Sequence, residues 1–369
     1  MRRSFCFQGL MISAGDESFM TNGLYLRPAG FVYGDAAKQA ATTHQAGLLA
    51  GGPVGFTFIE VIEGAPGKTG KQLRSFADLH ASGEREAGAL LEAITAPRPP
   101  IGPLSLERPR IMGVVNVTPD SFSDGGLYAS ETNAIAHARK LVGEGADIVD
   151  IGGESTRPGS GPVDAQDEAA RVLPVIEGLK DAGALISVDT RKSEVMEKAV
   201  KAGAHILNDV SALSHDPASL KVAARSGLPV VLMHAQGDPK TMQDDPAYDD
   251  VVLEVFDYLA ERIAACEAAG IDRSRIIADP GIGFGKTLEH NLALLQGLSL
   301  FHALGVVLLL GVSRKRFIGT LSDEADPQAR EPGSLAAALA GIAQGVQMVR
   351  VHDVAATRQG MTIWSAINC

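Results

Sequence analysis

IMGVVNVTPDSFSDGG, residues Ile111 to Gly126, is a short apolar run that ends in a polar loop containing glycine. Residues 111–117 have the composition of a strand buried on both faces, and the following Thr-Pro-Asp triplet stops it. Asn116 lies at the carboxyl end of this strand. Because the loops leaving that end carry ligand-binding residues in parallel α/β proteins, Asn116 is the first candidate site residue.

The same pattern of a short apolar run and a polar end recurs along the chain after Arg110. The expected strands are residues 111–117, 148–151, 185–188, 205–207, 229–233, 276–278, 306–310 and 348–351. Expected helices between them are 132–143, 165–180, 192–201, 251–268, 288–298 and 335–344, and a glycine follows most of them. Eight such units predict a (β/α)8 TIM barrel. A doubly wound open sheet is the alternative, but the even count of strands and the near-absence of other material favour closure.

The first part of the chain does not follow this rhythm. Residues 1–95 are predicted to be a small N-terminal α/β extension of unknown function, with a strand at 56–62 and apolar residues at helical intervals over 71–94. Residues 96–110, APRPPIGPLSLERPR, are predicted to be a proline-rich linker. Residues 111–369 then form the catalytic barrel domain.

Composition narrows the class of protein. With 369 residues, 45% hydrophobic and 5% aromatic content, the chain has the make-up of an α/β enzyme, and its net charge of −11 argues against a general binder of nucleic acid or anionic membranes. The three cysteines are far apart and odd in number, which predicts a reducing compartment without disulfides. Polar residues and glycines near the amino terminus interrupt any signal-peptide core, so we expect a cytoplasmic protein.

The polar residues at the strand ends predict a site at one mouth of the barrel. Acceptors suited to a flat heterocycle with amino and lactam groups are Asp189, Asn208 and Asp279. Cationic groups suited to phosphate or carboxylate are Arg314, Lys315, Arg350 and His352. With oxygen ligands at hand and no Cys/His cluster, the expected metal is Mg²⁺, held through Asn116 and the phosphates of the substrate.

Other tempting signals are weaker. Residues 281–286, GIGFGK, lack the Walker spacing and are predicted to be a tight turn between a strand and a helix, with Lys286 near the site. His137 and His205 are predicted to be structural, whereas His234 could be structural or functional. The carboxylates at 244–245 and 249–250 are predicted to be loop and helix-start charges.

These motifs resemble one family closely, the dihydropteroate synthases. The resemblance covers about residue 111 to the carboxyl terminus and leaves residues 1 to about 108 unexplained. It rests on NVTPDSFSDGG from Asn116, DIGGESTRPGS from Asp150, VDT from Val188, ND at Asn208, LMH and QGDPKTMQ around His234, DPGIGFGK from Asp279, GVSRKRFIG from Gly311 and RVHDV from Arg350. The chain departs from the family at Ala235, often Met, and Ile282, often Phe; both positions line the pocket.

The resemblance implies a reaction and a role for each matched residue. The family joins p-aminobenzoate to 6-hydroxymethyl-7,8-dihydropterin diphosphate, giving 7,8-dihydropteroate and pyrophosphate, and its carbon–oxygen bond breaks largely before the amine attacks. By resemblance, the pterin ring is bound by Asp189, Asn208, Asp279 and Lys315, and Asp189 also stabilises the cationic pterin methylene. The diphosphate and Mg²⁺ are held by Asn116, Arg350 and His352. The p-aminobenzoate is framed by Phe122, Thr156, Arg157, Pro158 and Ser313. Members are commonly homodimers and are targets of sulfonamides.

Two other functions compete with this interpretation. A pterin-dependent methyltransferase of the corrinoid type would share the pterin-binding strand ends, but the SFSDGG loop, SRK and RVH favour a diphosphate leaving group. A non-catalytic pterin-binding or assembly protein would use the N-terminal extension as its working part.

Overall fold

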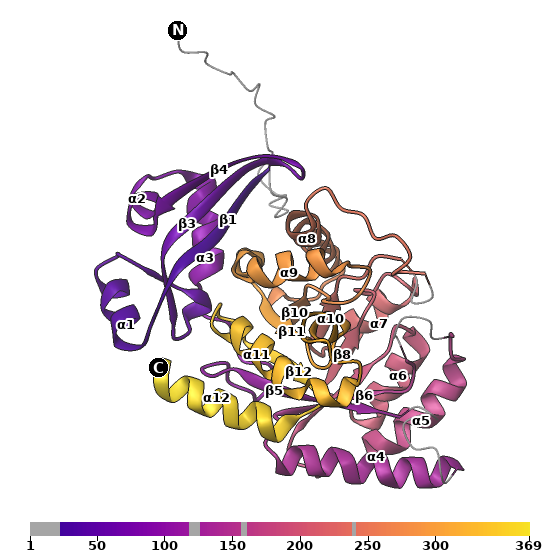
Figure 1. Cartoon of the computed structure of the whole chain (residues 1–369). Helices are drawn as coiled ribbons and strands as arrows, with labels where there is room; N and C mark the ends of the chain where they lie inside the picture. The colour runs from indigo at the N-terminus through magenta and orange to yellow at the C-terminus, as the bar shows by residue number, and fades with distance from the viewer. Residues whose placement is uncertain (1–22, 118–125, 156–160, 238–240) are drawn as a thin grey trace.

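A closed barrel of parallel strands forms the centre of the molecule (Figure 1). The structure, a computed structural model, describes residues 23–117, 126–155, 161–237 and 241–369, with only the backbone for residues 126–130. The barrel strands follow the order β10-β11-β12-β5-β6-β7-β8-β9, and β9 pairs with β10. Their bounds are β5 Arg110–Asn116, β6 Ile148–Gly152, β7 Leu185–Asp189, β8 Ile206–Asp209, β9 Val230–Met233, β10 Ile276–Asp279, β11 Val307–Leu310 and β12 Met348–Val351. The predicted (β/α)8 barrel is confirmed, each strand lying within a residue or two of its expected bounds.

Helices surround the barrel. They are α4 Gly126–Gly143, α5 Ala165–Glu177, α6 Ser193–Ala202, α7 Ser219–Ser226, α8 Val251–Ala268, α9 Leu288–Gln296, α10 Arg316–Ser322, α11 Glu331–Ile342 and α12 Val354–Asn368, with 3-10 helices η3 Arg273–Arg275, η4 Leu298–Leu304 and η5 Pro327–Arg330. Asp250 caps α8 through the amides of Val252 and Leu253, as its helix-start position predicts. Of these helices, α7, α10 and α12 have no counterpart in the sequence prediction. None of the helices in the described ranges is long and apolar enough to cross a membrane.

A four-stranded antiparallel sheet with short helices precedes the barrel, and we call residues 24–95 the N-terminal module. It contains β1 Leu24–Tyr33, α1 Gly34–Thr42, β2 Gly47–Leu48, η1 Leu49–Gly51, β3 Val54–Ala65, β4 Lys68–Ser75, α2 Phe76–Ala81 and α3 Arg85–Thr95. β3 is the central strand and pairs with the other three. The strand expected at 56–62 is therefore confirmed. The helical interpretation of 71–94 is wrong for its first residues, because Lys71 pairs with Ile62 in the β3–β4 hairpin.

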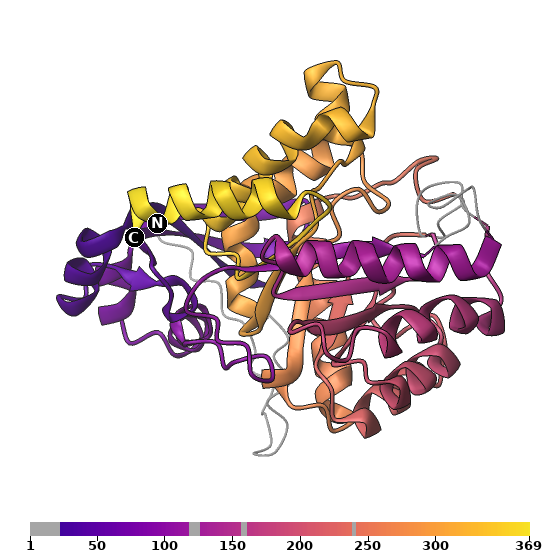
Figure 2. The ribbon, with the colours of Figure 1, turned by 90° about the horizontal axis from the view of Figure 1, so that it is seen from below.

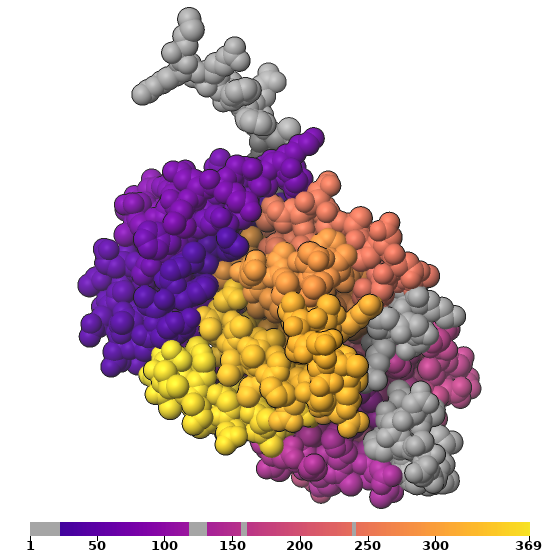
Figure 3. Space-filling view, viewed as in Figure 1, coloured from indigo at the N-terminus to yellow at the C-terminus, as the bar shows by residue number. Residues whose placement is uncertain are grey.

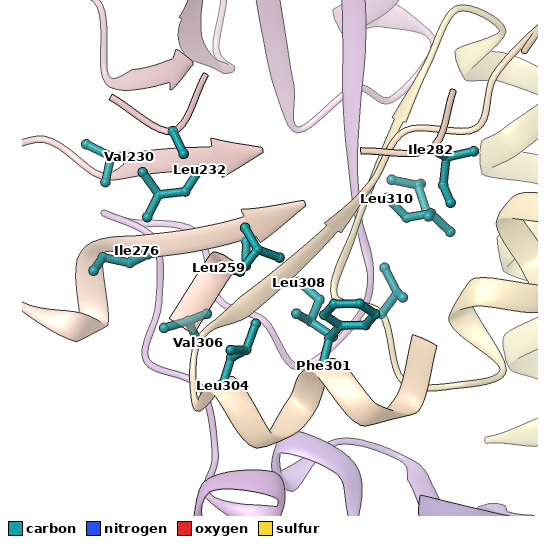
Figure 4. Packing of buried hydrophobic residues seen from close by; sticks show 14 of the residues in the cluster. Val230, Leu232, Leu259, Ile276, Ile282, Phe301, Leu304, Val306, Leu308 and Leu310 are labelled. Atoms are coloured by element: carbon teal, nitrogen blue, oxygen red, sulfur yellow. The ribbon is translucent and has the colours of Figure 1, made fainter. Parts of the chain in front are cut away.

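The module packs tightly against one side of the barrel (Figures 1 and 3). Its buried residues belong to the same hydrophobic cluster as those of the barrel, and β1 and α3 both contact η4. Figure 4 shows Phe301 of η4 beside Leu308 of β11, which extends this core into the barrel wall. The end of α12 reaches the module as well, where Gly34 approaches the carbonyl of Asn368 (Figure 2).

The proline-rich segment that follows the module is packed along the barrel. Ile101 belongs to one hydrophobic cluster with inward-facing residues of the barrel strands, including Met112 and Ile148. The Arg98 guanidinium is buried and donates to the carbonyls of Ala93, Ala96, His302 and Val306. Division into residues 1–95, 96–110 and 111–369 stays a prediction, since module, segment and barrel share their buried surfaces.

Candidate active site

The polar residues at the strand ends stand at one level of the barrel. Asn116 of β5 is in register with Gly152 of β6, Gly152 with Asp189 of β7, and Asp189 with Asn208 of β8. Parallel strands in register present their carboxyl ends together, so this row forms one side of the mouth. The convergence predicted from the sequence is confirmed for these positions.

Arg350 of β12 links the acidic residues of the mouth. Its Nε lies 2.7 Å from Asp150 Oδ2 and its terminal nitrogen 2.8 Å from Asp189 Oδ2. Asn208 Nδ2 donates to the same Asp150 oxygen at 3.0 Å. One hydrogen-bonded chain therefore runs from Asn208 through Asp150 and Arg350 to Asp189.

The charges in this chain shift each other's protonation. Burial raises the pKa of Asp189 to about 7, although Arg350 lowers it, and the like charge of Asp150 adds to the rise. Burial alone would lower the pKa of Arg350, but Asp150 and Asp189 raise it above its ordinary value. Asp189 is thus a carboxyl group that changes charge near neutral pH, inside a mouth where Arg350 stays cationic.

Asp279 and Lys315 occupy the other side of the mouth. Asp279 at the end of β10 is buried and accepts a hydrogen bond from the amide of Gly281 at 2.7 Å. Burial raises its pKa, against that amide and the charges of Lys315, Arg350 and Lys286. The Lys315 ammonium lies 4.1 Å from the centre of the Phe284 ring, a cation–π contact.

Two glycines keep space open between these groups. A Cβ atom added at Gly311 would lie 3.7 Å from Asp279 Oδ2 and 4.0 Å from Arg350 Cβ. One added at Gly152 would lie 3.5 Å from Asp189 Cβ. Side chains at these two positions would therefore lie in contact with the residues of the mouth.

The turn after β10 confirms the interpretation of GIGFGK. Gly281, Gly283 and Gly285 all have positive φ, and a Cβ at Gly281 would lie 1.8 Å from the carbonyl oxygen of His234, so the turn requires glycine there. α9 begins directly after Thr287, whose side chain accepts from the His290 amide in a capping box. The sequence predicts a tight strand-to-helix turn at this place, and the structure has one.

Lys286 and His234 form a buried pair behind that turn. The Lys286 ammonium lies 2.8 Å from His234 Nδ1 and also donates to the carbonyl of Phe284. Burial, followed by the charge of Lys286, lowers the pKa of His234 to about 2, and burial lowers that of Lys286 well below its ordinary value. His234 is therefore held in a buried pair with Lys286 behind the turn, and its role stays open between structural and functional.

The remaining cationic candidates divide into two groups. His352 Nδ1 and Ser313 Oγ lie 3.0 Å apart, and Ser313 also accepts from the His352 amide, so these two candidates meet at the mouth between β11 and β12. Arg314 instead pairs with Asp353 through both Nε and a terminal nitrogen. Its expected place among the anion-holding groups is therefore not supported by its contacts.

Some candidates cannot be placed. Phe122, Thr156, Arg157 and Pro158 lie outside the described residues. Within the part of the chain that is described, no group of three or more His, Cys, Asp or Glu side chains is arranged to hold a metal ion. Asn116, half-buried at the end of β5, remains the protein oxygen donor expected for Mg²⁺.

The sequence reasoning assigned no role to Asp150, and it counted Glu154 only among the polar residues at the strand ends. Asp150 has no exposed surface, and its signal was a lone acidic residue inside the apolar run IVDIG. Glu154 accepts from Arg191 and Lys192, and Lys192 also pairs with the fully buried Glu168. These ion pairs anchor the start of the loop after β6.

Comparisons with known proteins agree with this geometry. Residues 112–352 match the model of a family described as pterin binding enzyme. The dihydropteroate synthase of Escherichia coli strain K12 is 50% identical over 264 residues, which cover 71% of this chain and 93% of that protein.

Solved structures lead to the same family. The Xanthomonas albilineans dihydropteroate synthase with 4-aminobenzoic acid matches with a TM-score of 0.68 and 51% identity, over 72% of this chain and 94% of that one. The same enzyme in complex with 7,8-dihydropteroate gives 0.66 and 48%, over 72% and 95%. The matching part of the chain carries the mouth with Asp189, Asn208, Asp279 and Arg350, and on these grounds the chain belongs to the dihydropteroate synthases of the pterin-binding enzyme family.

Proposed function

We propose that this chain joins p-aminobenzoate to 6-hydroxymethyl-7,8-dihydropterin diphosphate, forming 7,8-dihydropteroate and releasing pyrophosphate. The observation that carries the proposal is the mouth of the barrel, where the acceptors Asp189, Asn208 and Asp279 lie together with the charges of Arg350 and Lys315. A flat ring with amino and lactam N–H groups matches the acceptors, and an anionic leaving group matches the cations.

The pterin ring is held by Asp189, Asn208, Asp279 and Lys315 in this proposal. Asn208 donates its amide N–H to Asp150, so its carbonyl oxygen is the end available to a ring N–H. Asp279 has one oxygen engaged by the Gly281 amide, and its other oxygen faces the space beside Gly311. Lys315, stacked over Phe284, supplies a donor for a ring carbonyl.

The diphosphate is held by Arg350 and His352 together with Asn116. Guanidinium and imidazole groups donate to phosphate oxygens; Arg350 is the next-to-last residue of β12, and His352 directly follows the strand. Asn116 would hold Mg²⁺ with the diphosphate, since an ion that prefers oxygen and retains water needs few protein ligands. When bound, the ion would reduce the negative charge that builds up on the departing pyrophosphate.

Asp189 carries the electrostatic part of the reaction. The carbon–oxygen bond breaks before the amine attacks, so positive charge develops on the pterin methylene. The ionised Asp189 carboxylate stabilises that charge in a partly desolvated mouth, where its effect is larger than in water. The p-aminobenzoate amine then attacks the cation and loses its proton, and no enzyme nucleophile takes part. Ser313, with Phe122, Thr156, Arg157 and Pro158, would frame the p-aminobenzoate.

Two further properties follow from the family resemblance. We propose a homodimer, supported by the exposed Leu321, Ile363 and Ile367 on α10 and α12, and sedimentation velocity would measure it. We also propose a cytoplasmic location, with which the free cysteines Cys266, buried, and Cys369, exposed, agree.

The test is pyrophosphate release by the purified chain with the pterin diphosphate and Mg²⁺, with and without p-aminobenzoate. Release should depend on p-aminobenzoate and on Mg²⁺, and should be lost in Asp189→Ala but kept in Asp181→Ala, which removes an exposed carboxylate before the same strand. A wild-type protein that binds pterin without releasing pyrophosphate would contradict the proposal. Binding of methyltetrahydrofolate in that case would support the methyltransferase alternative.

A further inference from the structure

Asp150 is a buried carboxylate that lies just below the mouth. It is two residues before Gly152 on β6, so its side chain is on the same face of the strand, one step deeper in the barrel. It has no solvent-exposed surface. A buried carboxylate is costly unless other groups compensate its charge, so its partners indicate what it is for.

A single oxygen of Asp150 holds two residues of the mouth. Oδ2 accepts from Arg350 Nε at 2.7 Å and from Asn208 Nδ2 at 3.0 Å. The two ends of an asparagine amide differ, so this bond decides which end of Asn208 faces the mouth. The bond to Nε likewise sets the plane of the Arg350 guanidinium, whose terminal nitrogen then reaches Asp189.

Asp150 also sets the charge of the cluster. Asp150 and Asp189 share the one guanidinium of Arg350, so the three residues together carry one negative charge when both acids are ionised. Further negative charge near Asp189 comes from Glu168 of α5 and Asp209 of β8. The net negative charge of these three residues would stabilise a cation that forms beside them.

We propose that Asp150 is the positioning residue of the pterin site, which turns the Asn208 carbonyl toward the ring and keeps Arg350 and Asp189 paired with a net negative charge. The inference rests on the proposed function. Asp150 acts through Asn208 and Arg350, since its Oδ2 accepts hydrogen bonds from these two side chains.

Ser187 provides a matched control for this residue. It is in register with Asp150 on the neighbouring strand β7 and is equally buried. Its hydroxyl has no hydrogen-bond partner among the described protein atoms, and neither has Asp150 Oδ1. Ser187→Ala therefore removes a buried polar atom at the same depth without touching the chain from Asn208 to Asp189.

The test compares Asp150→Asn and Ser187→Ala with the wild type in the full chain. Asp150→Asn should lower kcat/KM for the pterin diphosphate about 10- to 100-fold, the usual range for a partner that orients a ligand-binding side chain. The KM for p-aminobenzoate should stay within about twofold. The acid limb of the rate profile should move to lower pH, because removing the like charge of Asp150 lets Asp189 ionise more easily. Ser187→Ala should leave all three quantities unchanged.

Unchanged kinetics and an unmoved acid limb in Asp150→Asn would overturn the inference, as would equal losses in Ser187→Ala. If Asp150→Asn does not fold, Asp150→Glu keeps the charge and displaces the oxygens; it should keep the acid limb and lose pterin affinity, and unchanged affinity would overturn the inference. Failure of the proposed function is distinguishable, because the wild type itself would then show no pyrophosphate release.

Discussion

Two arginines of this chain, the buried Arg98 and the half-buried Arg350, are held in opposite ways. Arg98, where the N-terminal module meets the barrel, donates to four backbone carbonyls. Arg350, at the mouth, is held by the carboxylates of Asp150 and Asp189. Burial and the charge of Arg273 lower the pKa of Arg98 to about 10, whereas the two carboxylates raise that of Arg350 above its ordinary value.

The difference separates a structural cation from a functional one. Backbone carbonyls of Ala93, Ala96, His302 and Val306 cannot change charge, so Arg98 connects α3 and η4 with the residue that precedes β11. The carboxylate partners of Arg350 can take up a proton or bind a ligand. The ion pairs of Arg350 can therefore change when a substrate binds. The junction should therefore govern stability, and the mouth should govern turnover.

The largest effect is expected from Arg98→Met. It leaves four backbone carbonyls without their donor, two in buried and two in part-buried hydrogen bonds, so the free energy of unfolding should fall by about 3–5 kcal/mol in urea titrations. The kcat of the folded fraction should stay within about twofold. Arg108→Met, which removes a partly exposed arginine paired with Asp147, is the control and should cost less than about 1 kcal/mol. A large fall in kcat for Arg98→Met would break the separation between junction and mouth.

Asp189→Asn should have the converse outcome. Turnover should fall about 100-fold or more, because the amide cannot stabilise a developing cation as the carboxylate does. Stability should stay equal or rise. The folded-state pKa of Asp189 is raised, so its contribution to stability is present at low pH and is lost as the pH rises toward about 7. A lower melting temperature in Asp189→Asn at pH 8 would show that its pairing with Arg350 outweighs its burial.

The pH dependence of turnover sharpens the same point. Below about pH 7, Asp189 takes up a proton and loses the charge that the cation needs, so kcat/KM should fall about tenfold per pH unit. The measurement is a rate profile from pH 5.5 to 8.5 with saturating Mg²⁺. A profile that is flat across this range would mean that Asp189 stays ionised in the complex.

The smallest effect is expected at the edge of the junction. Tyr25 of β1 donates to Asp257 of α8 at 2.8 Å and packs edge-on against Phe256. Tyr25→Phe keeps the ring contact, so unfolding should be weakened by about 1 kcal/mol with unchanged kcat. Tyr33→Phe, which removes a bond to the carbonyl of Ala343, should cost a similar amount. A loss as large as that of Arg98→Met would show that the junction depends on β1 more than on the buried arginine.

Much of the barrel was predictable from local pattern. Runs such as VVLM of β9 are apolar on both faces, and the positive-φ Gly203 closes α6 where the spacing expects a helix to end. Strand β4, which overlaps the start of the helix predicted over residues 71–94, could not be found in this way. Its residues 68–75 are mostly exposed and depend for their hydrogen bonds on β3.

The sequence by itself determined the eight strands, the polar residue at the end of each and, through its motifs, the family. These are local properties, because burial on both faces and a change to polar residues are written in a few neighbouring positions. The tertiary structure decided that Arg350 pairs with Asp150 and Asp189, that Arg314 turns to Asp353, and that His234 pairs with Lys286. Such pairings join residues far apart in the chain, since barrel closure and strand register place each charge beside its partner.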